Sequence, residues 1–421
     1  MAPNSTQLIE LSEIEKAYHR IKGVARKTPL ERNDWLSKKF EANIYLKRED
    51  LQVVRSYKIR GAYNNIATCT ERQLANGVVC ASAGNHAQGF AFACKALKVQ
   101  GKVFMPVTTP GQKIEKVRTF GEEYVEIILV GDTYDEAYRE AIKISDKENL
   151  HFIHPFSDRA TITGQATVGK EIFDQFEDGN IDYLLLPVGG GGLAAGVGSY
   201  SKQVSPSTKI IGLEPEGAPA MYNALSEGKV VRLEKIDRFV DGAAVQEVGD
   251  YPFTICKTIL DDLLLVPEGR ICSYILDMYN HEAIVVEPAG VISIAGLEHC
   301  REEIKGKNIV CLVSGGNNDI TRTEEIKERS LLFEGLKHYF IITFPQRAGA
   351  LRDFLNEILG PNDDITHFQY TKKTSRTSGP AVVGIRCATK SDYERLIQKM
   401  EDKHIHYEHL NNNKLLFDIL V

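Results

Sequence analysis

Short, continuous apolar runs alternate with amphipathic segments along the first three quarters of the chain. Apolar residues that recur every three or four positions predict helices, and short unbroken apolar runs predict buried strands. The expected strands cover residues 44–46, 78–81, 103–107, 125–130, 184–188, 210–213 and 309–313. The expected helices cover residues 87–96, 114–120, 133–144 and 162–176. This alternation indicates an α/β fold with a parallel sheet covered on both faces, which binds ligands at the carboxyl ends of its strands.

The pattern changes near residue 325, after a segment dense in Glu, Lys and Arg. The expected order there is strand, helix, two strands, helix and strand, which is a ferredoxin-like α+β unit. The strands are expected at residues 340–344, 368–371, 381–385 and 415–420, and the helices at residues 349–359 and 393–400. We therefore expect two domains, residues 1–325 and residues 326–421.

Charge and cysteine usage exclude several classes of protein. The 421 residues carry a formal net charge of -6, whereas nucleic-acid and membrane-surface binding both favour a basic face. The eight cysteines are scattered without a C-x-x-C pair, which indicates reduced thiols in a cytoplasmic protein and no zinc site. The N-terminal residues lack a signal-peptide pattern, and no apolar run is long enough for a membrane span.

The stretch Ser56-Tyr57-Lys58-Ile59-Arg60-Gly61 opens an apolar-periodic run. Ser56 is a good N-cap residue, so Lys58 is expected in the first turn of a helix. A helix N-terminus disfavours a protonated amine, and such a lysine suits Schiff-base chemistry. By itself the stretch favours a solvated surface lysine, which is by far the commoner situation, so other segments of the chain must support the Schiff-base alternative.

Four consecutive glycines, Gly189-Gly190-Gly191-Gly192, and Leu193 follow the expected strand at 184–188 and precede a helix. Unscreened backbone N–H groups beside a helix N-terminus form an anion site of phosphate size. The alternative is a flexible turn. The segment has neither the dinucleotide G-x-G-x-x-G context nor the Lys-Ser/Thr ending of a P-loop.

Two further turns follow expected strands and could contact a ligand. Ser82-Ala83-Gly84-Asn85-His86 precedes a helix, and the Asn85 amide can both donate and accept hydrogen bonds. A helix cap is the alternative there. Ser314-Gly315-Gly316-Asn317 ends the strand at 309–313, where an ordinary turn is the alternative.

Together these four segments resemble, in order and spacing, the pyridoxal-phosphate enzymes of fold type II, and most of all the threonine dehydratases. The resemblance runs over essentially the whole chain and implies two lobes with parallel sheets, the smaller lobe inserted at roughly residues 50–155. It implies that Lys58 carries the cofactor and removes the Cα proton of threonine. It also implies roles in cofactor binding for Asn85 at the ring hydroxyl, Ser314 at the pyridine nitrogen and Gly189, Gly190, Gly191, Gly192 and Leu193 at the phosphate.

The resemblance also implies a reaction. A serine facing the pyridine nitrogen leaves it largely neutral, which favours elimination of the β-hydroxyl over transamination. The products would be 2-oxobutanoate and ammonia, the first step of isoleucine biosynthesis. The substrate carboxylate would be received by Ser82, Ala83, Gly84, Asn85 and His86. The cofactor phosphate is the hypothetical acid for the leaving hydroxyl.

Differences from the serine racemases of this fold favour a dehydratase over a racemase. Serine racemases of this fold carry a serine where this chain has Ala83, and a one-base site should mostly eliminate. Ala220 replaces an acidic ligand of their divalent-metal site, so no such metal is expected, although a monovalent ion stays open. The segments 287–290 and 241–245 resemble cofactor-lining segments and are equally compatible with a helix start and a turn.

The C-terminal unit resembles the ACT-like regulatory domain of biosynthetic threonine dehydratases. An effector is expected at the turn that contains Gln346, Arg347 and Gly349, with isoleucine as inhibitor and valine as a possible activator. The alternative is a purely oligomerising domain. A homotetramer is expected from the resemblance alone. A broader serine/threonine dehydratase or racemase, and an inactive amino-acid sensor, are the competing functions.

Overall fold

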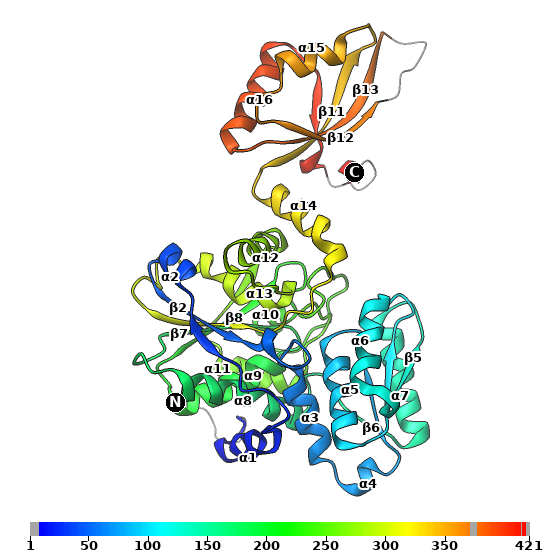
Figure 1. The fold of residues 1–421 in the computed structure, drawn as a ribbon, viewed down its shortest axis with the longest axis vertical. Coiled ribbons are helices and arrows are strands. Elements are labelled where there is room, and N and C mark those ends of the chain that lie inside the picture. The colour runs from blue at the N-terminus through cyan, green and yellow to red at the C-terminus, as the bar shows by residue number, and fades with distance from the viewer. Residues whose placement is uncertain (1–7, 371–376, 414, 418–421) are drawn as a thin grey trace. The chain divides into compact units, whose positions relative to one another are not determined.

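The computed structural model describes residues 8–370, 377–413 and 415–417. The chain divides into two compact units, Met1–Asp319 and Ile320–Val421 (Figure 1). The expected boundary between residues 325 and 326 would instead divide a helix, α14 (Thr323–Phe333). Each unit is considered separately below.

The larger sheet of the first unit has six strands in the order β1-β2-β10-β7-β8-β9. All neighbouring strands are parallel except β1 and β2. The strands are β1 (Leu30–Arg32), β2 (Asn43–Arg48), β7 (Tyr183–Pro187), β8 (Lys209–Pro215), β9 (Asp262–Val266) and β10 (Asn308–Val313). The central strand β7 is buried along its whole length, as its continuous apolar sequence predicts.

Helices cover both faces of this sheet, with α8, α9 and α11 on one side and α12 and α13 on the other (Figure 1). The helices outside the smaller lobe are α1 (Leu11–Ile21), α2 (Asp34–Phe40), α8 (Arg159–Gln175), α9 (Gly192–Val204), α10 (Ala220–Glu227), α11 (Asp250–Ile259), α12 (Glu268–Glu282) and α13 (Pro288–Ala295). Side chains of β7, α8 and α9 contribute to a large apolar core of the unit.

A smaller lobe lies between β2 and α8 in the chain. Its four parallel strands have the order β5-β4-β3-β6, with bounds β3 (Val78–Ala81), β4 (Gly101–Met105), β5 (Val125–Leu129) and β6 (His151–Phe152). Its helices are α3 (Lys58–Thr68), α4 (Glu71–Leu74), α5 (Asn85–Leu97), α6 (Gly111–Gly121) and α7 (Tyr134–Glu148). Two apolar cores lie on opposite faces of this sheet because α5 and α7 cover different faces.

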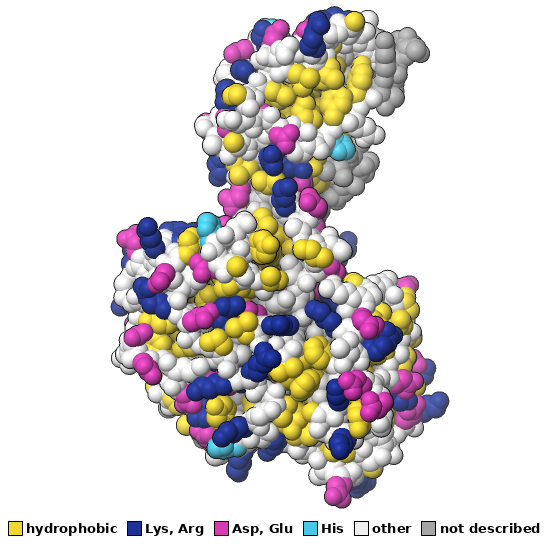
Figure 2. Space-filling model, viewed as in Figure 1, with side chains coloured by type: hydrophobic (Ala, Val, Ile, Leu, Met, Phe, Trp, Pro, Cys, Tyr) yellow, Lys and Arg dark blue, Asp and Glu magenta, His cyan; other side chains and the backbone are white. Residues whose placement is uncertain are grey.

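The second unit has a four-stranded antiparallel sheet in the order β12-β13-β11-β14. Its elements are α14, β11 (Lys337–Pro345), α15 (Ala350–Glu357), β12 (Asp364–Tyr370), β13 (Ser378–Arg386), α16 (Lys390–Asp402) and β14 (Tyr407–His409). Figure 2 shows apolar side chains gathered on this unit. Its exposed apolar side chains include Leu351 and Leu355 of α15 and Phe368 and Tyr370 of β12.

One expected strand of this unit is wrong. The fourth strand is β14, whereas residues 415–417 are helical and residues 418–420 lie outside the described part of the chain. Leu416 and Phe417 pack against Tyr339 on one face of the sheet instead of extending its edge. An apolar run that covers a sheet and one that joins a sheet have the same local pattern.

Within the described ranges, no helix is long and apolar enough to cross a membrane. The same residues contain no group of three or more His, Cys, Asp or Glu side chains arranged to hold a metal ion. All eight cysteines are free, and seven of them are buried.

Candidate functional site

Lys58 is the first residue of α3, and its amine faces a pocket at the carboxyl ends of the larger sheet. The amine donates a hydrogen bond to the carbonyl oxygen of Pro155, at 3.1 Å. Burial lowers the pKa of Lys58 to about 8, and the negative charge of Glu287 opposes this shift. An amine with this pKa is partly neutral near physiological pH, so it can act as a nucleophile or a base.

The expected position of Lys58 in the first helical turn is confirmed, but the expected cap is wrong. Tyr57 occupies the N-cap position and makes no side-chain cap hydrogen bond. The buried Ser56 hydroxyl has no hydrogen-bond partner in the described structure. Ser56 instead forms an antiparallel backbone bridge with Gly315, and this pairing holds the start of α3 against the end of β10.

The pocket collects residues from distant parts of the first unit. Its lining consists of Tyr57, Lys58, Asn85, Pro187, Gly189, Leu193, Gly242, Ala243, Glu287, Ala289 and Ser314. The structure therefore brings together five of the expected site residues, namely Lys58, Asn85, Gly189, Leu193 and Ser314. It also places the segments 241–245 and 287–290 at the pocket, although their sequence patterns were equally typical of a turn and a helix start.

The glycines Gly189–Gly192 join β7 to the N-terminus of α9, and side chains would not fit there. A Cβ atom on Gly189 would lie 2.8 Å from the Ala243 carbonyl oxygen, and one on Gly192 would lie 2.8 Å from the Phe156 carbonyl oxygen. Gly191 has φ of +88°, a conformation that side chains disfavour. The turn thus presents bare backbone N–H groups at the start of a long helix, which suits a phosphate group.

The Asn85 amide is fixed from both ends. Its Nδ2 donates to Oε1 of Glu287 at 2.6 Å, and its Oδ1 accepts from Nδ2 of Asn317 at 2.7 Å. Burial, followed by the charge of Asp241, raises the pKa of Glu287 to about 7, while the Asn85 hydrogen bond opposes this shift. The amide is consequently held in one orientation at the pocket.

Ser314 and the loop at the start of α5 complete the expected set. Ser314 is buried at the end of β10, and its hydroxyl donates to the carbonyl oxygen of Ala289 at 3.2 Å. Gly84 is the N-cap residue of α5, so residues 82–84 lie at the N-terminus of this helix. The His86 ring is buried, and its Nε2 lies 3.0 Å from the carbonyl oxygen of Ile153.

The residues that sequence reasoning missed lie in the segment after β6. Pro155 supplies the carbonyl oxygen that meets the Lys58 amine, and Phe156 packs against Gly190 and Gly192. The sequence could have indicated this segment only by its position, because it follows the carboxyl end of a parallel strand, where ligands commonly bind. A backbone carbonyl has no sequence signature of its own.

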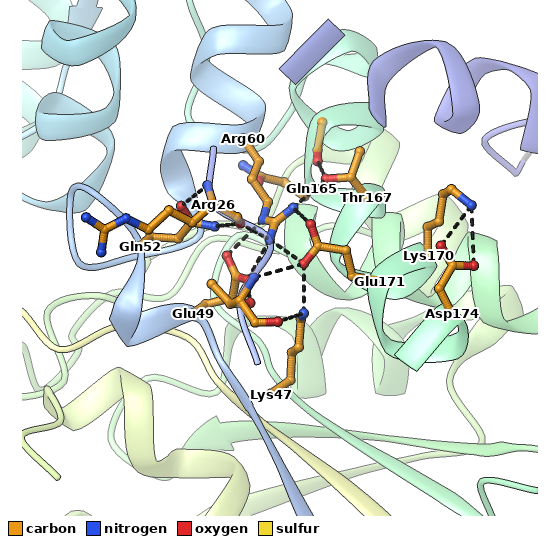
Figure 3. Close-up of polar contacts among 12 residues, drawn as sticks. Arg26, Lys47, Glu49, Gln52, Arg60, Gln165, Thr167, Lys170, Glu171 and Asp174 are labelled. Atoms are coloured by element: carbon orange, nitrogen blue, oxygen red, sulfur yellow. Dashed lines mark hydrogen bonds and ion pairs between the residues drawn. The ribbon is translucent and has the colours of Figure 1, made fainter. Parts of the chain in front are cut away.

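A buried ion cluster surrounds the side chain of Arg60, which belongs to α3 (Figure 3). The Arg60 guanidinium bonds both oxygens of Glu49 and both oxygens of Glu171, at 2.7–2.9 Å. Lys47 also bonds Glu171, at 2.7 Å. The charges of Glu49 and Glu171 raise the pKa of Arg60 although burial opposes this, so the cluster fixes a charged arginine two residues beyond Lys58.

The expected regulatory residues lie in the second unit, at the turn between β11 and α15. Gly349 is the N-cap residue of α15 and has φ of +86°. Arg347 pairs with Asp353 at 2.9 Å, and its side chain is 62% exposed. The turn therefore offers an exposed cation beside a helix start.

Comparison with known proteins bears on both units. A family model described as "Pyridoxal-phosphate dependent enzyme" matches residues 21–315, and one described as "C-terminal regulatory domain of Threonine dehydratase" matches residues 328–420. The chain is 54% identical over 413 residues to "L-threonine dehydratase biosynthetic IlvA" of Halalkalibacterium halodurans, covering 98% of this chain and 99% of that protein. It is 54% identical over 414 residues to the protein of the same name from Bacillus subtilis, covering 98% of each.

Solved structures agree with these relatives. A threonine deaminase isoform 2 from Solanum lycopersicum has a TM-score of 0.72 and 41% identity, covering 77% of this chain and 95% of that chain. A maize serine racemase has a TM-score of 0.70 and 28% identity, covering 77% and 99%. The expected fold, with two parallel sheets and an antiparallel regulatory domain, is confirmed, as is the pyridoxal phosphate cofactor. The chain belongs to the pyridoxal-phosphate-dependent enzymes of fold type II and, among them, to the family of biosynthetic L-threonine dehydratases with a C-terminal regulatory domain.

Proposed function

We propose that this chain converts L-threonine to 2-oxobutanoate and ammonia, as the first step of isoleucine biosynthesis. The observation that carries the proposal is the Lys58 amine, which has a lowered pKa and faces the same pocket as the glycine turn. The relatives named as biosynthetic threonine dehydratases support the substrate, since the chain matches them over nearly its full length.

The residues of the pocket fit pyridoxal phosphate. Gly189–Gly192, with the backbone of Leu193, would hold its phosphate at the N-terminus of α9, because no side chain blocks the approach there. Asn85 would hydrogen-bond the ring hydroxyl, and Ser314 would face the pyridine nitrogen. When bound, the cofactor supplies an aldehyde that captures the substrate amine and a conjugated ring that withdraws electron density from Cα.

Lys58 has two tasks in this proposal. Its amine would hold the cofactor, and as a free amine it would remove the Cα proton of threonine. A pKa of about 8 leaves part of the free amine unprotonated near neutral pH, which a base requires. The buried ion cluster of Arg60 keeps α3, and therefore Lys58, in register with the glycine turn.

The start of α5 is the proposed site for the substrate carboxylate. Ser82, Ala83, Gly84, Asn85 and His86 surround this helix N-terminus, whose backbone N–H groups attract an anion. Ala83 has no group that could protonate Cα from the face opposite Lys58. This supports elimination over racemisation, because racemisation needs protonation from both faces.

The second unit is proposed to bind isoleucine as an inhibitor, with valine as a possible activator, at the turn containing Gln346, Arg347 and Gly349. The match to the regulatory domain of threonine dehydratase supports an effector site. We also propose a cytoplasmic homotetramer, for which the exposed apolar side chains of α15 and β12 offer contact surface. Removing residues after Asp319, where the units divide, should leave dehydration intact and abolish isoleucine sensitivity.

The decisive test follows 2-oxo acid formation from threonine and from serine, with and without isoleucine, in the wild-type chain and in Lys58→Ala. We expect threonine turnover that isoleucine suppresses, and none in Lys58→Ala. Racemised serine without 2-oxo acid would support a racemase, and no turnover in the wild-type chain would support an amino-acid sensor. Equal isoleucine inhibition of the shortened chain would contradict the proposed effector site.

A further inference from the structure

His154 organises the turn after β6 through one ring nitrogen. Its Nδ1 accepts hydrogen bonds from the backbone N–H groups of Phe156, at 3.2 Å, and Ser157, at 2.8 Å. Its carbonyl oxygen accepts from the Thr161 hydroxyl at 3.0 Å. An imidazole nitrogen that accepts two N–H groups carries no proton, so the ring is neutral and protonated at Nε2.

This turn lies between the two groups that would hold the cofactor. The Pro155 carbonyl oxygen is 3.1 Å from the Lys58 amine. On the other side of the turn, a Cβ atom on Gly192 would lie 2.8 Å from the Phe156 carbonyl oxygen, and one on Gly190 would collide with the Phe156 ring. Any displacement of the turn would therefore reach both Lys58 and the glycine turn.

The surroundings of His154 favour its neutral form. Tyr138, Phe152 and Phe156 pack their rings around the imidazole, with the Phe156 ring centroid 4.7 Å away in an edge-to-face arrangement. Burial lowers the pKa of His154 to about 4, and the nearby charge of Lys58 acts in the same direction. The neutral His86 ring contacts the carbonyl oxygen of Ile153, the residue before His154. Two imidazole rings therefore bind the backbone of the segment after β6.

We propose that His154 is a positioning residue for Lys58. Through the two N–H groups accepted at Nδ1, it fixes the turn that directs the Pro155 carbonyl at the Lys58 amine and sets Phe156 against the glycine turn. The inference rests on the proposed role of Lys58 as the cofactor-bearing lysine. It assigns to His154 neither contact with substrate nor a proton transfer.

Asn and Gln substitutions at His154 test whether the position of the hydrogen-bond acceptor matters, because both side chains have an amide oxygen but place it differently. The Oδ1 of Asn lies the same number of bonds from Cα as Nδ1 of His, whereas Oε1 of Gln lies one bond further. In the full-length chain, we expect His154→Asn to bind pyridoxal phosphate within roughly threefold of wild type. His154→Gln and His154→Leu should bind it roughly tenfold more weakly or worse, as expected for loss of buried hydrogen bonds. His151→Leu, three residues earlier, is the matched control and should bind like wild type.

A second readout does not involve the bound cofactor. In the cofactor-free chain, modification of the Lys58 amine by an amine-reactive reagent, mapped by mass spectrometry across pH, reports its environment directly. The midpoint in His154→Asn should stay at the wild-type value. The midpoint in His154→Gln should fall, because a displaced turn no longer holds the Pro155 carbonyl against the ammonium form. Equal affinities of the Asn and Gln variants, or equal midpoints in the two, would overturn the proposal.

Borohydride reduction of each holoenzyme, followed by peptide mapping, keeps this proposal separate from the proposed function. Attachment of the cofactor to another lysine would overturn the assignment of Lys58 itself. Attachment to Lys58 in every variant, with Asn and Gln indistinguishable, would overturn only the role of His154.

Discussion

Asn85 and Glu287, 202 residues apart in the chain, meet at 2.6 Å beside Lys58. The carboxyl group of Glu287 has its pKa raised to about 7 by burial, and its negative charge raises the pKa of Lys58 in turn. The amine, the amide and the carboxyl group therefore form one electrostatic unit.

Replacing Glu287 by Gln should lower the pKa of Lys58 below about 8, because it removes the negative charge that opposes the effect of burial. The measurement is the pH midpoint of Lys58 modification in the cofactor-free chain. Glu227→Gln, at the exposed end of α10, is the control and should leave the midpoint unchanged. A midpoint that rises in Glu287→Gln would show that the carboxyl group does not act through its charge.

His86→Gln should make the first unit less sensitive to acid. Burial lowers the pKa of His86 from 6.5 to about 3. Between these two pH values, His86 is protonated in the unfolded chain and neutral in the folded chain. The contribution of His86 to stability is therefore full above pH 6.5 and is lost as the pH falls, by about 1.4 kcal/mol per pH unit. Gln keeps a donor near the Nε2 position and does not titrate.

Urea unfolding at neutral pH and at a pH of about 5 measures this effect. The free energy of unfolding should fall less steeply in His86→Gln than in wild type. His19→Gln, on the exposed side of α1, should follow the wild-type slope. Parallel slopes in all three chains would mean that His86 is protonated in the folded state.

Gly190→Ala should weaken pyridoxal phosphate binding by about tenfold or more, because the added methyl group meets the Phe156 ring in a tightly packed turn. Gly111→Ala, at the start of α6, should bind the cofactor like wild type, because an added Cβ atom would meet nothing within 4 Å there. Absorbance titration of the cofactor-free chains measures both affinities. Undiminished affinity in Gly190→Ala would place the phosphate elsewhere.

Arg60→Met should destabilise the first unit by about 3–5 kcal/mol, because Glu49 and Glu171 would remain buried with less compensating charge. Chemical unfolding followed by tryptophan fluorescence measures the loss, since the single tryptophan, Trp35, lies in the same unit. Arg118→Met removes an exposed arginine and should change stability by less than about 1 kcal/mol. A loss in Arg60→Met no larger than that in Arg118→Met would mean that the cluster adds nothing to stability.

The sequence predicted those features that depend on local pattern. The buried runs of β7 and β10 predicted a parallel sheet, and the glycines were correctly expected between β7 and the start of a helix. The place of Lys58 in the first turn of a helix was also predicted correctly. The assignment of function needed the resemblance, because each turn alone had an ordinary structural explanation.

Other features depend on contacts between distant segments and could not be predicted. The Pro155 carbonyl oxygen accepts a hydrogen bond from Lys58, 97 positions away in the chain. The identity of a proline residue does not predict such a contact. Ser56 is a residue type that often caps helices, yet its backbone pairs with that of Gly315 instead. Leu416 and Phe417 have the apolar pattern of a strand, but they are helical and pack against Tyr339.

The order of strands in the larger sheet has a consequence for synthesis of the chain. β10, the last strand of the first unit, lies between β2 and β7, and Ser314 at its end lines the pocket. A ribosome must therefore translate and release the chain beyond residue 315 before the sheet can close around Lys58. Such long-range pairing slows folding, so a nascent chain passes through a stage with an unfilled gap in the middle of its sheet. The Lys58 amine therefore acquires its pocket only when the first unit is essentially complete.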